Sequence, residues 1–142
     1  MKQIVVAVSG YFDPPTPAHL SYFKDARLLG DKLVVILNND EQLLLKRAGT
    51  PLDRRIRYPL KDRIQILEAF KWVDEVFVSI DTDGTIAESL RRVKPNIFAK
   101  GGDRVINNLP QAELNACKDI GCEIVCGVGC DKTHSSSWYN WE

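Results

Sequence analysis

Short, continuous apolar runs alternate along this chain with longer stretches in which apolar residues recur every three or four positions. Runs of four to eight residues rich in Val and Ile are typical of strands that are buried on both faces of a sheet. Five such strands are expected, at residues 4–8, 33–37, 73–78, 95–99 and 123–128. Because helical stretches separate them through short links, the pattern predicts a parallel α/β sheet with right-handed crossovers.

The helical stretches are recognised by their spacing and by their start and stop signals. Between the first two strands, Leu20, Phe23, Ala26 and Leu29 follow one another at intervals of three, and Gly30 stops the helix. Further helices are expected after Pro59, over residues 86–93 and over residues 110–120. No repeat or linker interrupts the series, so one domain over residues 1–142 is predicted.

One stretch, residues 41–58, departs from this regularity. It contains Gly49 and Pro51, shows little core periodicity, and is predicted to be irregular. Its basic residues are Lys46, Arg47, Arg54, Arg55 and Arg57. Long irregular segments in compact domains are often functional lids. The alternative is a solvated connector.

The turn after the first strand, residues 10–19, carries the candidate chemistry. Thr16 can cap the following helix, and Pro17 suits its first position because that residue needs no hydrogen-bond donor. His19 then lies in the first helical turn, beside free backbone N–H groups and the positive end of the helix dipole. These features predict a phosphate site at the carboxyl end of the first strand, where open α/β sheets bind ligands.

Composition restricts the partners. Among 142 residues, Lys plus Arg equals Asp plus Glu at 19 each, so the net charge is zero. A chain without a global positive field is not expected to bind nucleic acid or an anionic membrane. No apolar run reaches the roughly 18 residues of a membrane span, and the chain runs directly into its first strand without a leader, so a cytoplasmic protein is expected.

Five residues of the turn match a known pattern in register: Gly10, Phe12, Asp13, Thr16 and His19. The turn resembles the Gly-x-Phe-Asp-x-x-(His/Thr)-x-Gly-His signature of the cytidylyltransferase-like nucleotidyltransferases, which include glycerol-3-phosphate cytidylyltransferases and heptose-phosphate adenylyltransferases. The resemblance implies a Rossmann-like three-layer α/β/α fold with a five-stranded parallel sheet. It also implies transfer of CMP or AMP from CTP or ATP to a phosphorylated small molecule, with release of pyrophosphate.

The resemblance assigns roles to individual residues. It implies that His19, Thr16 and Lys46 are catalytic. The residues expected to bind nucleotide or phosphate are Gly10, Tyr11, Phe12, Asp13, Arg63, Lys100, Gly101, Gly102, Asp103, Ser135, Ser136 and Ser137. No metal ligand is assigned, because Mg²⁺ is expected to be bound mainly through the phosphates. Lys46 would reach the triphosphate from the basic segment as it closes.

Two departures from the pattern support an alternative from another class. Ala18 replaces the usual Gly, and Cys130 lies near the place of an Arg that usually precedes the Ser triplet. The alternative is a nucleotide-binding regulatory module of the same fold without catalysis. A flavodoxin-like electron carrier shares the fold class, but the basic segment argues against it. The nucleotide base is left open: the resemblance to cytidylyltransferases covers most of the chain, whereas Thr16 and residues 100–103 favour adenylyl transfer.

The remaining late residues are assigned structural roles. The four cysteines, Cys117, Cys122, Cys126 and Cys130, lack zinc-site spacing and are interpreted as reduced structural thiols, with a redox role as the alternative. Trp138 and Trp141 are expected to serve packing or a homodimer contact.

Overall fold

The computed structural model describes residues 2–53, 55–102 and 106–129, and these form a five-stranded, all-parallel sheet. The strand order is β3-β2-β1-β4-β5. The strands are β1 (Val5–Gly10), β2 (Lys32–Leu37), β3 (Glu75–Val78), β4 (Ile97–Gly101) and β5 (Glu123–Val128). The predicted parallel α/β sheet is therefore confirmed, with all five strands at the expected places in the chain.

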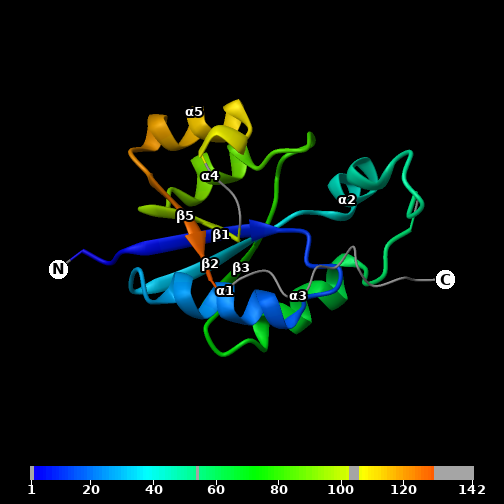
Figure 1. Cartoon of the computed structure of the whole chain (residues 1–142), viewed down its shortest axis with the longest axis horizontal. Coiled ribbons are helices and arrows are strands. Elements are labelled where there is room, and N and C mark those ends of the chain that lie inside the picture. Colours follow the sequence, from blue (N-terminus) through cyan, green and yellow to red (C-terminus); the bar gives the residue numbers. More distant parts are fainter. Residues whose placement is uncertain (1, 54, 103–105, 130–142) are drawn as a thin grey trace.

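Helices cover both faces of the sheet and form the two outer layers of a three-layer α/β/α fold (Figure 1). The helices are α1 (Pro17–Arg27), α2 (Asp40–Arg47), α3 (Leu60–Glu68), α4 (Ala87–Val93) and α5 (Gln111–Ile120). Helices α1 and α3 pack on one face, and α4 and α5 pack on the other. Among the described helices, none is both long and apolar enough to span a bilayer.

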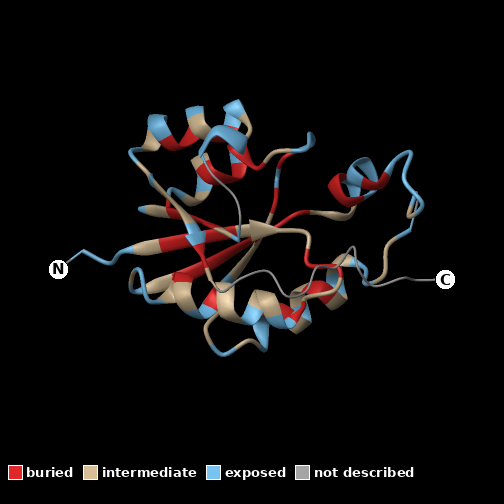
Figure 2. Cartoon of the chain, in the orientation of Figure 1, coloured by how far each residue is buried: buried red, intermediate tan, exposed pale blue. Residues whose placement is uncertain are grey.

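The two cores follow from strand alternation. In β1, Val6 and Val8 point to the core shared with α1 and α3, whereas Ala7 points to the core shared with α4 and α5. Both faces of the central strands are thus buried, as the red colouring in Figure 2 shows. This double burial explains why these strands read in the sequence as continuous apolar runs rather than as alternating ones.

The strand order places a topological switch point beside β1. After β1 the chain winds to β2 and β3 on one side, and it later returns to place β4 on the other side, where Val6 pairs with Ile97. The connections that follow β1 and β4 therefore leave the sheet on opposite faces. A crevice for ligands is expected at the carboxyl ends of these two strands.

The prediction that residues 41–58 are irregular is wrong for their first half, which forms α2. The helix begins at an Asn39 cap, whose side chain accepts a hydrogen bond from Gln42 N at 2.8 Å. Gln42 and Arg47 are buried beside Leu43. Because the inner face of α2 is mainly polar, the spacing of apolar residues does not predict this helix. In Figure 1, α2 stands apart from the other helices, beyond the carboxyl end of β2.

Candidate active site

The amino end of α1 has the structure that the sequence predicted. Thr16 is the N-cap residue with extended backbone, and Pro17 occupies the first helical position. The backbone N–H of Thr16 donates to Nδ1 of His19 at 2.8 Å, which closes the cap through the side chain three residues on. The cap therefore fixes the His19 ring at the positive end of the helix.

The hydrogen bond to His19 also determines which ring nitrogen can donate. Because Nδ1 accepts from Thr16 N, the proton of the neutral imidazole resides on Nε2. The ring lies edge-on to Phe12, with 4.8 Å between centroids, and Phe12 itself is buried. This packing orients His19 as an Nε2–H donor at the start of the helix.

The path of the turn requires glycine at its first residue. A Cβ on Gly10 would lie 2.6 Å from the ring of Phe12, which folds back over that position. Phe12 has a positive φ of 49°, a left-handed conformation that is strained for a residue with a side chain. Gly10 thus allows the Phe12 ring to be buried, and the buried ring supports His19.

Asp13 ties the turn to the basic segment. Its buried carboxylate accepts from Nη1 of Arg47 at 2.7 Å and from the backbone N–H groups of Arg57 and Tyr58. The carbonyl of Asp13 accepts from Nη2 of Arg47 and from Nη1 of Arg57, both at 3.2 Å. We call these contacts the Asp13 clamp. It holds the turn at residues 10–19 against the end of α2 and against the loop that leads to α3.

The Asp13 clamp carries excess positive charge. Within it, the guanidinium of Arg47 contacts the carboxylate of Asp13, and the guanidinium of Arg57 contacts the carbonyl of the same residue. Burial and then the charge of Arg47 lower the pKa of Arg57, and Asp13 opposes them. Since arginine stays protonated at neutral pH despite such a shift, the clamp places two guanidinium cations beside the turn. That field favours an anion.

Lys46 reaches the same turn from the last residues of α2. Its Nζ lies 4.3 Å from the centroid of the Tyr11 ring, and Tyr11 is the first residue after β1. The structure therefore places Lys46 beside the turn that carries Thr16 and His19, and its catalytic role stays a prediction. The contact with Tyr11 was not expected.

Arg63 is fully buried, and its guanidinium is held by the protein. It donates to the carbonyls of Tyr58, Tyr11 and Asn38 at 3.0, 2.8 and 2.7 Å, and it pairs with Asp40. These bonds join the ends of β1 and β2 and fix the start of α2. The structure gives Arg63 a positioning role, and direct contact with phosphate stays a prediction.

The end of β4 faces the turn from the other side of the switch point. Lys100 is buried, with Nζ 3.4 Å from Ser9 Oγ and 4.8 Å from the Phe98 centroid. Gly101 approaches α1 so closely that a Cβ would lie 3.1 Å from the Tyr22 ring, and Gly102 has a φ of +60°. The predicted residues Asp103, Ser135, Ser136 and Ser137 lie outside the described part of the chain.

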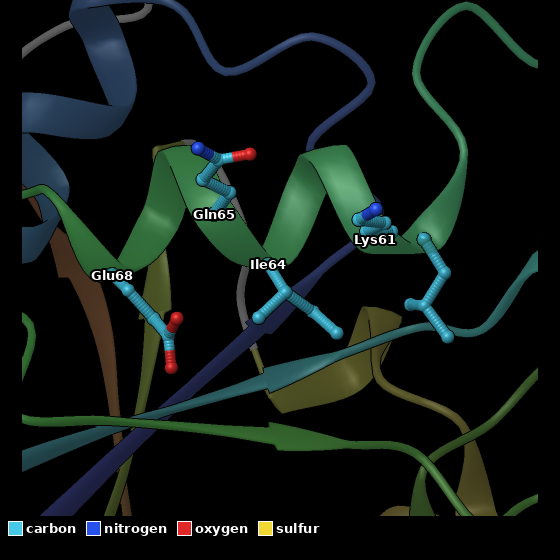
Figure 3. A pocket seen from close by; sticks show the side chains of 5 residues that line it. Lys61, Ile64, Gln65 and Glu68 are labelled. Atoms are coloured by element: carbon cyan, nitrogen blue, oxygen red, sulfur yellow. The ribbon is translucent and has the colours of Figure 1, made fainter.

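Two other features of the described residues contain none of the predicted site residues. Figure 3 shows an open pocket lined only by side chains of α3, namely Leu60, Lys61, Ile64, Gln65 and Glu68. Its one lysine is matched by one glutamate, so it lacks the positive charge that a triphosphate needs. Cys117, Cys122 and Cys126 are free thiols, and the described residues contain no metal-binding group of His, Cys, Asp and Glu.

Sequence reasoning missed Arg47 as a site residue. It counted Arg47 among the basic residues of an irregular segment, although Arg47 follows Leu43 by four positions, the spacing of one helix face. That spacing, together with the Asn39–Gln42 capping pattern, could have indicated a helix that buries an arginine.

Comparison with known proteins agrees with this geometry. A family model described as cytidylyltransferase-like matches residues 7–125. An FAD synthase of Thermococcus kodakarensis is 37% identical over 107 residues, which cover 75% of this chain and 67% of the relative. The bifunctional protein HldE of Methylococcus capsulatus is 38% identical over 100 residues, which cover 70% of this chain and 20% of that protein.

A solved structure shares the fold over almost the whole chain. The lipopolysaccharide core biosynthesis protein from Thermoplasma volcanium aligns with a TM-score of 0.73 at 25% identity, over 92% of this chain and 100% of the other. The chain thus spans about two thirds of the archaeal FAD synthase and about a fifth of HldE.

Proposed function

The chain belongs to the cytidylyltransferase-like family of nucleotidyltransferases, and from this membership we propose that it transfers CMP or AMP from CTP or ATP to a phosphorylated small molecule. One observation carries the proposal. His19 at the start of α1, Lys46 at the end of α2 and the cationic Asp13 clamp converge on one turn. A helix N-terminus with an imidazole donor, a lysine ammonium and two guanidinium groups around one turn suit a triphosphate.

The reaction is an in-line displacement. An oxygen of the acceptor phosphate attacks the α-phosphorus, the bond from that phosphorus to the α,β-bridging oxygen breaks, and its electron pair leaves with pyrophosphate. Because the acceptor is already an anion, the protein needs no general base for it. Catalysis then consists of positioning and of stabilising charge on the phosphate oxygens.

The residues of the turn divide this work. Nε2–H of His19 donates to a phosphate oxygen from the start of α1, and Thr16 holds the ring in place. Lys46 stabilises charge from the opposite side. We place the nucleotide across the carboxyl ends of β1 and β4, where Gly101 and Gly102 permit close approach. Mg²⁺ enters as part of the triphosphate substrate, which suits a site whose nearest carboxylate, Asp13, already accepts three hydrogen bonds.

The relatives favour particular substrates for the first test. FAD is formed by joining AMP to flavin mononucleotide, so the likeness to FAD synthases supports ATP as donor and flavin mononucleotide as one acceptor. Glycerol 3-phosphate and a sugar phosphate represent the other branches of the family. We expect pyrophosphate release only when the correct pair is present.

The measurement is pyrophosphate release from CTP, ATP, GTP or UTP with Mg²⁺ and each acceptor, together with thermal unfolding. A triphosphate at 100 times its Kd should stabilise the protein by about 2.7 kcal/mol. Stabilisation by a nucleotide, without pyrophosphate from any acceptor, would favour the non-catalytic regulatory module. A protein that no triphosphate stabilises would contradict both.

Lys46→Ala is expected to lower kcat by about 10²-fold while changing the free energy of unfolding little, because an exposed charge contributes little to folding. Lys24→Ala, which removes an exposed lysine from α1, is the matched control and should keep full activity. Hydrogen exchange over residues 41–58, with and without Mg²⁺ and nucleotide, tests the proposed lid motion. If residues 41–58 are equally protected in both states and Lys46→Ala keeps full activity, the segment is a connector and not a lid.

A further inference from the structure

The cap at the end of α5 brings two cysteines together. Gly121 caps this helix with a left-handed φ of 70°, and its N–H donates to the carbonyl of Lys118 at 3.3 Å. The next backbone N–H, that of Cys122, donates to the carbonyl of Cys117 at 2.8 Å. These two bonds define a Schellman motif, in which the side chains at the positions of Cys117 and Cys122 frequently make an apolar contact.

Both thiols take part in that contact. Cys117 belongs to the core that the sheet shares with α4 and α5, and Cys122 packs against the same core. The two thiols also hydrogen-bond to each other, which lowers the pKa of Cys117 and raises the pKa of Cys122. The packing contact of the motif is therefore made here by two groups that can be oxidised to a disulfide.

The backbone spacing of this pair suits a disulfide. Because a 2.8 Å hydrogen bond joins Cys122 N to Cys117 O, standard bond lengths limit the separation of the two Cα atoms to at most about 6.7 Å. Disulfides join Cα atoms that are about 4.4–6.8 Å apart, so the backbone does not have to move to bring the pair within range. Cys126 lies four residues beyond Cys122 along β5, about 13 Å away on an extended strand, and is too far from Cys122 to replace Cys117.

The two thiols differ in their access to solvent. Cys117 is 1% exposed, whereas Cys122 is half-buried, so a small oxidant reaches the sulfur of Cys122 first. The pKa of Cys117 is lowered because the S–H of Cys122 donates to its sulfur. Burial and the charge of Glu113 oppose this shift, and the charge of Lys100 supports it. Since a thiolate is the form that attacks a disulfide, Cys117 suits the second, intramolecular step of an oxidation.

We propose that Cys117 and Cys122 are a reversible dithiol–disulfide site whose oxidation joins the end of α5 covalently to the residue before β5. The oxidant is a small-molecule disulfide of the glutathione class. The site is independent of the proposed nucleotidyl transfer.

The oxidation proceeds in two exchange steps. The sulfur of Cys122, after losing its proton, attacks one sulfur of the oxidant and displaces a thiolate, which leaves a mixed disulfide on Cys122. The thiolate of Cys117 then attacks the sulfur of Cys122 and displaces the second thiolate. The two protein thiols give their two protons to the departing thiolates, and the two electrons that the pair loses reduce the oxidant.

The test uses the full chain with Cys126→Ser and Cys130→Ser, which keeps Cys117 and Cys122 as its two cysteines. This variant is incubated with mixtures of oxidised and reduced glutathione, quenched with acid, alkylated and analysed by mass spectrometry. We expect both thiols to be lost together, with the mass of two hydrogens and without bound glutathione, and dithiothreitol should restore them. Trypsin cleaves after Lys118, so the peptides on either side of that residue should appear as one linked species.

Single substitutions in this variant separate the two steps. With Cys117→Ala, Cys122 should take up one glutathione and keep it as a mixed disulfide. With Cys122→Ala, the buried Cys117 should stay reduced in the folded protein. If the variant with both cysteines keeps its two thiols, or stops at a mixed disulfide, the proposal is overturned. In the wild-type chain, tandem mass spectrometry should place the bridge between Cys117 and Cys122, and a bridge at Cys126 or Cys130 would equally overturn it.

Thermal unfolding tests whether the bridge fits the folded protein. Oxidation of the variant with both cysteines should raise the midpoint of unfolding, because a cross-link restricts the unfolded chain, and dithiothreitol should reverse the rise. The same treatment should leave the midpoint unchanged once Cys122→Ala is added. An oxidised protein whose midpoint does not rise would show that the disulfide distorts the cap of α5, and it would contradict the proposed site.

Discussion

Replacing His19 by alanine is expected to lower kcat by about 10²–10³-fold, the cost of removing one preorganised donor to a developing charge. His19 is half-buried at the start of α1, and its Nδ1 accepts from Thr16, so Nε2–H is the donor that we assign to a phosphate oxygen. The measurement is kcat at saturating nucleotide and acceptor.

Two conservative variants distinguish the role of Nδ1 from the role of Nε2 in His19. Asparagine places an acceptor near the Nδ1 position and keeps the cap with Thr16, but it lacks a donor at the position of Nε2. Glutamine places an amide N–H near the Nε2 position and does not reproduce the acceptor at Nδ1. If Nε2–H is the catalytic donor, His19→Gln should retain more activity than His19→Asn. His19→Asn should in turn be more stable than His19→Ala.

The loss in the free energy of unfolding caused by His19→Ala is expected to be small compared with the loss of kcat. Alanine leaves the Thr16 N–H without its acceptor, which corresponds to a loss of about 0.5–2 kcal/mol for a helix cap. Urea unfolding measures this loss. A variant that folds normally and turns over at the wild-type rate would contradict the role of His19 in catalysis.

Asp13→Ala is expected to cause the largest loss of stability, about 3–5 kcal/mol in the free energy of unfolding. The substitution removes the carboxylate that Arg47 contacts at 2.7 Å and leaves that buried guanidinium without its counter-charge. It also removes the acceptor of two backbone N–H groups, those of Arg57 and Tyr58. The loss is a large part of the 5–15 kcal/mol that stabilises a typical domain.

The matched control for Asp13→Ala is an ion pair at the surface. Arg91 contacts Glu88 and Asp119 at 3.1 and 3.0 Å, but all three side chains reach solvent. Arg91→Ala should therefore change stability by less than about 1 kcal/mol. Equal, small losses in Asp13→Ala and Arg91→Ala would show that the Asp13 clamp does not hold the turn to α2. Asp13→Asn keeps an acceptor and should fall between the two.

The sequence determined those features that depend on residues a few positions apart. Continuous apolar runs identified the five strands, because both faces of each central strand are buried. The cap at Thr16 and Pro17 identified the start of α1, and His19 was placed in its first turn by spacing alone. Gly10 and Phe12 were recognised as two residues of a family signature, but the contact between them, a ring folded over a position without a Cβ, is visible only in the structure.

Only the tertiary structure decided what the charged residues do. Arg47 and Lys46 are neighbours in a basic segment, yet Arg47 is buried against Asp13, 34 positions away, while Lys46 stays exposed over Tyr11. Arg63 is held by three backbone carbonyls and Asp40, a set of contacts that its position in the sequence did not indicate. The physical reason is that the free energy of burying a charge depends on whether a partner lies within about 4 Å, and that distance is set by how the crossovers fold back on the sheet.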